Sequence, residues 1–211
     1  MIYLSFFLIR IGECLALEYD DIKINPKNKE NVFISISKTK TTQKDEYGNP
    51  IFNTPKTAKS IRKIPLNKAA RKALFSQIEK KEKIFLSNAI ERLSVNQQYE
   101  WVILLPGIGC HGCIQEAEFF MKKHISNEKI LFVLTNMESL KILQQKTGVE
   151  IKSHPNVYID RNNQFKLPTD HSIYPCVIQV NKGKLQQYAF QSPKTPALYN
   201  LEKLLKQQHK E

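Results

Sequence analysis

Two cysteines separated by two residues are the part of the sequence best suited to chemistry. Cys110 and Cys113 enclose His111, directly after a short apolar stretch that ends at Pro106. At the start of a helix, unpaired amide N–H groups and the positive end of the helix dipole stabilise a thiolate, the form of cysteine that attacks disulfides. We therefore predict that Cys110 is the nucleophile and that Cys113, one turn into the helix, is the resolving thiol. A protonated His111 would further favour the thiolate.

Other interpretations of the cysteines remain open at this point. Cys14 and Cys176 have no close partner in the sequence, which argues against a disulfide framework and against the paired spacing of a zinc ribbon. Cys110 and Cys113 could also form an inert structural pair or half of a shared metal site. We predict that Cys176, next to Pro175, is a small buried hydrophobe. His124, His154 and His171 share no metal-ligand spacing, so we interpret them as surface or core histidines. We expect neither a metal nor a cofactor.

The elements that position this pair alternate between strands and helices. WVILLP at 101–106 and ILFVL at 130–134 have the apolar pattern of buried strands, and a helical pattern follows each of them, the second closed by Gly148. Two such strand-then-helix units predict a parallel strand pair with a crossover helix. We expect Phe119 and Phe120 of the first helix to lie in the core.

The rest of this half predicts a short strand, a hairpin and a closing helix. VYI begins at Val157, and CVIQV and KLQQYAF are joined by Asn181-Lys182-Gly183, a hairpin signature. Thr195 and Pro196 suit the N-cap and first turn of a last helix. The sequence therefore predicts an α/β domain over residues 101–211.

This order of elements, with the cysteine pair directly after the first strand, resembles the thioredoxin superfamily over residues 97–207. Tyr174 and Pro175, immediately before the hairpin, also fit the family pattern. The resemblance implies a thioredoxin-like fold, a central mixed sheet flanked by helices, in which Pro175 is cis, packs against the dithiol and shapes the substrate groove. It implies a thiol–disulfide oxidoreductase with a protein dithiol or disulfide as its partner. Gly109 replaces the family's usual Trp, which favours a specialised redox role.

The front half of the chain is more basic and predicts a small α+β module. Residues 1–96 carry 18 Lys and Arg against 10 Asp and Glu, whereas the remainder carries 14 against 10. Apolar segments at 32–36 and 61–66 predict an antiparallel sheet, separated by a polar excursion. Asn67 is the predicted N-cap of a helix. A basic surface of this kind favours phosphate partners, DNA among them.

Two motifs in this half resemble the catalytic domain of phage-integrase-type tyrosine recombinases. They are IRIGECLAL with EYDDI at 9–22 and TPKTAKSIRKIPL at 54–66, and the resemblance covers residues 1–87. It implies that Arg10 contacts the scissile phosphate and that Lys56, with Lys59 as the alternative, is a general acid. It also implies contacts to the DNA backbone from basic residues of this half, namely Lys38, Lys40, Lys56, Lys59, Arg62 and Lys63.

The remaining parts of a recombinase site are not found in the sequence. No His is followed three residues later by Arg, and Tyr188 and Tyr199 belong to the thioredoxin-like pattern. We therefore expect no recombinase activity from this chain. A basic module unrelated to integrases is the alternative for this half.

The predicted organisation is an inactive integrase-like fragment at 1–87, a junction at 88–100 and a thioredoxin-like domain at 101–211, of bacterial, mobile-element origin. The alternative function is a DNA-associated protein, related to DNA integration, in which the cysteine pair is structural. No apolar run reaches the length of a membrane span, so we expect a cytoplasmic protein without a membrane partner. The sequence does not indicate an oligomeric state.

Overall fold

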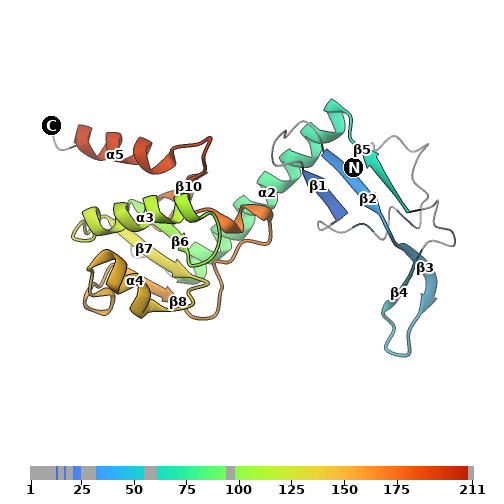
Figure 1. Ribbon diagram of the computed structural model, residues 1–211, viewed down its shortest axis with the longest axis horizontal. Helices are drawn as coiled ribbons and strands as arrows, with labels where there is room; N and C mark the ends of the chain where they lie inside the picture. Colours follow the sequence, from blue (N-terminus) through green and yellow to red (C-terminus); the bar gives the residue numbers. More distant parts are fainter. Residues whose placement is uncertain are drawn as a thin grey trace. The chain divides into compact units, whose positions relative to one another are not determined.

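The computed structural model describes residues 13, 17, 21–24, 32–54, 61–93 and 98–208 (Figure 1). In this part of the chain the protein is mixed α/β, and the chain divides into two compact units, Met1–Glu79 and Lys80–Glu211. The division falls inside one continuous helix, α2 (Lys68–Leu93).

This division differs from the predicted one. α2 extends into the predicted junction at 88–100 and ends at Leu93. Ala89 and Ile90, within that junction, are buried in the core of the second unit. The residues that end α2 therefore belong to the second unit by their packing.

The first unit contains the predicted antiparallel sheet. Its strand order is β1 (Ile22–Ile24), β2 (Val32–Ile36) and β5 (Arg62–Pro65), with both pairs antiparallel. Alternate residues of β2 are buried because a strand directs successive side chains to opposite faces. The polar excursion is itself a hairpin of β3 (Thr39–Lys44) and β4 (Pro50–Asn53), a feature that its composition did not predict.

The N-cap of α2 is the predicted one. The side-chain oxygen of Asn67 accepts a hydrogen bond from the Ala70 amide at 2.8 Å, which satisfies one of the unpaired donors of the first turn. Ala70 and Leu74 then pack into the core of the first unit with β2 and β5.

The second unit is built on a five-stranded mixed sheet of order β10-β9-β6-β7-β8. Its strands are β6 (Trp101–Pro106), β7 (Ile130–Thr135), β8 (Val157–Asp160), β9 (Cys176–Asn181) and β10 (Lys184–Phe190). β6, β7 and β8 run parallel, whereas β9 and β10 form an antiparallel hairpin beside β6. The predicted parallel pair and hairpin are thus confirmed. Lys182 and Gly183 both have positive φ, as the tight turn between the hairpin strands requires.

The central strand β6 contributes to two apolar cores. Trp101, Ile103 and Leu105 face one core, which also contains side chains of three helices, α3 (His111–His124), α4 (Leu140–Thr147) and α5 (Ala197–Gln208). Val102 and Leu104 face the other core, which contains the end of α2. Because both faces are covered, all six residues of β6 are buried, which explains the continuous apolar run in the sequence.

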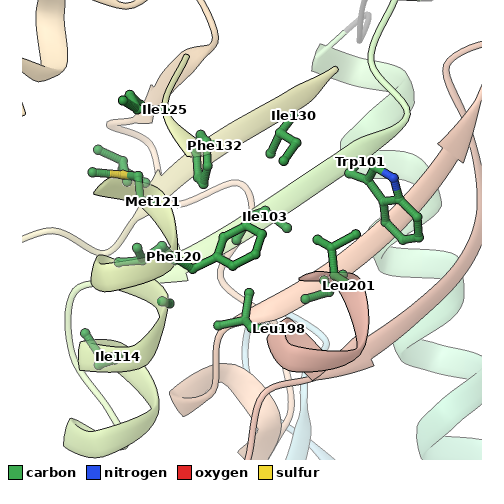
Figure 2. Close-up of a cluster of buried hydrophobic side chains, with 14 of the residues drawn as sticks. Trp101, Ile103, Ile114, Phe120, Met121, Ile125, Ile130, Phe132, Leu198 and Leu201 are labelled. Carbon is green, nitrogen blue, oxygen red and sulfur yellow. The ribbon is translucent and has the colours of Figure 1, made fainter. Parts of the chain in front are cut away.

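Figure 2 shows how α3 joins the first of these cores. Phe120 projects from α3 toward Ile103, with Leu198 and Leu201 of α5 nearby. Phe119, by contrast, is 69% exposed, so its predicted place in the core is wrong. Adjacent helical residues are about 100° apart around the axis, and only Phe120 shares the buried face of Ala117 and Met121.

This pair of adjacent residues provides a test of the core. Phe120→Ala should lower the free energy of unfolding by about 3–5 kcal/mol, because it empties a filled site. Phe119→Ala is the matched control, with an expected change of about 0.5 kcal/mol or less, since it removes an exposed ring. Urea unfolding of both variants measures the difference, and equal losses would contradict this placement of α3.

Candidate functional site

The candidate site is the cysteine pair at the beginning of α3. Cys110 is the N-cap residue, with φ −65° and ψ 101°, and its carbonyl accepts the Ile114 amide at 2.9 Å. Cys110 and Cys113 are joined as a disulfide, with an S–S distance of 2.13 Å. Cys110 is half-buried, whereas Cys113 is only 4% exposed. His111, the first residue of α3, is exposed beside them.

Two glycines allow the chain to turn from β6 into α3. A Cβ atom at Gly107 would lie 2.6 Å from the Asn136 carbonyl oxygen, which follows the neighbouring strand β7. Gly109 has φ +153°, and a Cβ there would lie 2.2 Å from the Ile173 carbonyl oxygen. The absence of a side chain at 109 therefore permits a close backbone approach. A larger residue at this position would overlap the Ile173 backbone.

A second segment lies directly against this turn. The 3₁₀ turn η4 (Asp170–Ile173) ends with Ile173, whose carbonyl accepts the Cys110 amide at 2.9 Å. Pro175 follows and is buried, and its carbonyl accepts the Gln191 amide at 2.8 Å. Segment 169–175 is therefore bonded to the start of α3 and to the end of β10.

The prediction that the peptide bond before Pro175 is cis is wrong. Among the described residues no peptide bond is cis, and the Tyr174–Pro175 bond is therefore trans. Tyr174 donates its amide to the His171 carbonyl at 3.0 Å, so the turn continues directly to the proline.

Two side chains that hold this region, Glu82 and Gln191, were not predicted from the sequence. Glu82 is a buried carboxylate on α2, and its Oε1 accepts the Thr169 hydroxyl at 2.6 Å and lies 2.8 Å from His171 Nδ1. The available signal was an acidic residue four positions before Leu86, on the apolar stripe of the helix. Gln191 donates to Glu116 of α3 and accepts the Leu198 amide. No pattern in the sequence indicates these contacts.

The other cysteine of this region is confirmed as a buried residue. Cys176, the first residue of β9, is fully buried and has a free thiol. Burial, and secondarily the negative charge of Glu82, raise the pKa of the Cys176 thiol well above its ordinary value. Cys176 therefore stays protonated at neutral pH and does not act as a nucleophile in the folded protein.

Of the predicted DNA-contacting residues, only some lie in the described part of the chain. Arg10, Lys56 and Lys59 lie outside it. Arg62 forms a two-pronged ion pair with buried Glu13, with N–O distances of 3.1 and 2.9 Å. This hydrogen bonding raises the pKa of the Arg62 guanidinium. The Glu13 carboxylate therefore occupies one edge of the guanidinium, and a phosphate would otherwise bind at that edge.

The described residues contain no group of three or more His, Cys, Asp or Glu side chains placed to hold a metal ion. Within the same ranges, no helix combines the length and the apolar composition needed to cross a bilayer.

No protein-family model matches the chain, and comparisons with curated proteins and with solved structures found no match.

The close approach at Gly109 can be tested against a second glycine of the same turn. Gly109→Ala should destabilise the protein by about 2 kcal/mol or more, because its Cβ would overlap the Ile173 carbonyl. Gly112→Ala is the control, since a Cβ there meets nothing within 4 Å, and we expect a gain of about 0.5 kcal/mol from helix propensity. Urea unfolding measures both changes. An unchanged free energy of unfolding in Gly109→Ala would contradict the close approach of residue 109 to the Ile173 carbonyl.

Proposed function

We propose that the second unit is a thioredoxin-like thiol–disulfide oxidoreductase that acts through Cys110 and Cys113. The observation that carries the proposal is the disulfide in the first turn of α3, which joins half-buried Cys110 at the N-cap to buried Cys113. Free N–H groups of this turn favour a thiolate at Cys110 once the pair is reduced. The parallel strands and the hairpin beside β6 are consistent with a thioredoxin-like arrangement.

The proposed reaction exchanges one disulfide for another. The Cys110 thiolate attacks a sulfur of a protein disulfide, forms a mixed disulfide and releases one substrate thiolate, which takes a proton from solvent. Cys113 then loses its proton to solvent, attacks the Cys110 sulfur and releases the second substrate thiolate, which takes a proton in turn. The enzyme dithiol is oxidised and the substrate disulfide is reduced, with two electrons transferred. The reverse sequence oxidises a substrate dithiol.

Two further residues have supporting roles in this proposal. His111 is exposed next to Cys110, where its protonated form would favour the thiolate. Pro175 is buried two residues after Ile173, so it limits the conformations of the segment that contacts Cys110. That segment would form one wall of the substrate groove.

Substitution of each cysteine tests the proposal. Cys110→Ser should abolish reduction of a protein disulfide such as that of insulin, because no thiolate remains to attack. Cys113→Ser should instead trap a mixed disulfide between Cys110 and the substrate, detectable on non-reducing gels and by mass spectrometry. Cys176→Ser is the control and should leave the rate unchanged. Unchanged turnover in Cys110→Ser would overturn the proposal.

A second function, DNA binding by the first unit, is favoured by the exposed cations of its strands. Lys44 of β3 and Lys63 of β5 are exposed, and the Lys63 ammonium lies 4.9 Å from the centre of the Phe33 ring. We propose that these residues, together with partly exposed Lys40, contact the phosphates of duplex DNA. Such contacts would bind duplex DNA without reading its sequence.

Charge reversal tests this second function. In a gel-shift assay, Lys44→Glu and Lys63→Glu together should weaken binding to duplex DNA and reduce the slope of log K against log salt by about 2, since two phosphate contacts are lost. Lys122→Glu and Lys203→Glu together, at exposed positions of the second unit, are the control with the same change in net charge. DNA affinity that is absent in the parent protein, or equal in all variants, would contradict the assignment.

A further inference from the structure

A buried carboxylate on α2 anchors the segment that touches Cys110. The Glu82 side chain is 3% exposed, yet its Oε1 contacts the Thr169 hydroxyl at 2.6 Å and His171 Nδ1 at 2.8 Å. The Tyr188 hydroxyl lies 3.4 Å from the other oxygen. Burial of a carboxylate costs free energy that only such hydrogen bonds compensate. The Glu82 carboxyl group is thus within hydrogen-bond distance of three side chains.

These contacts fall on the turn that leads to the disulfide. Thr169 is the N-cap residue of η4, and His171 is its second residue. Ile173, the last residue of η4, accepts the Cys110 amide. Glu82 is thus linked to Cys110 through one short turn of chain.

The far end of the same segment is held independently. The Pro175 carbonyl accepts the Gln191 amide, and Gln191 is buried with both ends of its side-chain amide bonded. Glu82 therefore supplies the anchor at the N-terminal end of segment 169–175, and Gln191 supplies the other.

We propose that Glu82 is a positioning residue for thiol–disulfide exchange at Cys110. Through Thr169 and His171 it holds η4 so that the Ile173 carbonyl keeps the Cys110 amide in its N-cap geometry. That geometry keeps Cys110 at the N-terminus of α3, where the positive end of the helix dipole favours a thiolate. This inference rests on the proposed function and adds a residue of α2 to it.

The test measures alkylation of Cys110 by iodoacetamide against pH, in a Cys113→Ser background. Glu82→Ala should slow alkylation at neutral pH by about threefold to tenfold, because the thiolate fraction falls when the N-cap geometry loosens. The plateau rate at high pH, where every thiol is ionised, should not change. A merely structural effect would not slow alkylation at neutral pH while leaving the plateau rate at high pH unchanged.

Two variants of the same helix serve as controls. Glu91→Ala removes a carboxylate from the exposed face and should leave the whole profile unchanged. Leu86→Ala removes a fully buried side chain one turn after Glu82, so it should lower the stability to urea without lowering the neutral-pH rate. An unchanged profile in folded Glu82→Ala, or an equal slowing in Leu86→Ala, would overturn the proposal.

A variant on the other side of the contact covers the case in which Glu82→Ala does not fold. His171→Phe removes the contact between Nδ1 and Glu82 but keeps a ring against Phe190, whose centre lies 4.6 Å from that of His171. We expect alkylation of Cys110 at neutral pH to slow about twofold or more. An unchanged rate would overturn the proposed link between Glu82 and Cys110. Loss of the proposed function itself is recognised separately, as failure of the parent protein to exchange with protein disulfides.

Discussion

One close backbone contact determines the arrangement at the cysteine pair. The Cys110 amide reaches the Ile173 carbonyl at 2.9 Å, and the approach is possible because residue 109 has no side chain. Both partners of the contact are held from elsewhere. α3 is held by Phe120 and its neighbours in the core, and η4 by Glu82. The reactivity that we propose for Cys110 depends on all of these parts meeting at one turn.

The sheet of the second unit explains why they meet there. Parallel strands bring their carboxyl ends to one edge, so the chain after β6 passes close to Asn136 after β7 and enters α3 at that edge. β9 runs in the opposite direction beside β6, which places its first residue, Cys176, opposite Leu104. The residues that precede β9 therefore arrive at the same edge as Cys110.

In the first unit, an ion pair changes the interpretation of a motif residue. Arg62 lies in the motif at 54–66, but its guanidinium is bonded to buried Glu13. A two-pronged bond to a carboxylate uses one edge of the guanidinium, which is then not available to a phosphate. Exposed Lys44 and Lys63 are therefore the stronger candidates for the proposed contacts to DNA.

The sequence by itself determined the local features: the strands at 101–106 and 130–134, the hairpin turn at Lys182 and Gly183, the Asn67 cap and the burial of Cys176. Each follows from periodicity or from the conformational preferences of nearby residues. Tertiary structure alone decided the trans bond at Pro175, the exposure of Phe119 and the role of Glu82 beside His171. These depend on which surfaces meet after folding, and contacts between residues far apart in the chain leave no local pattern.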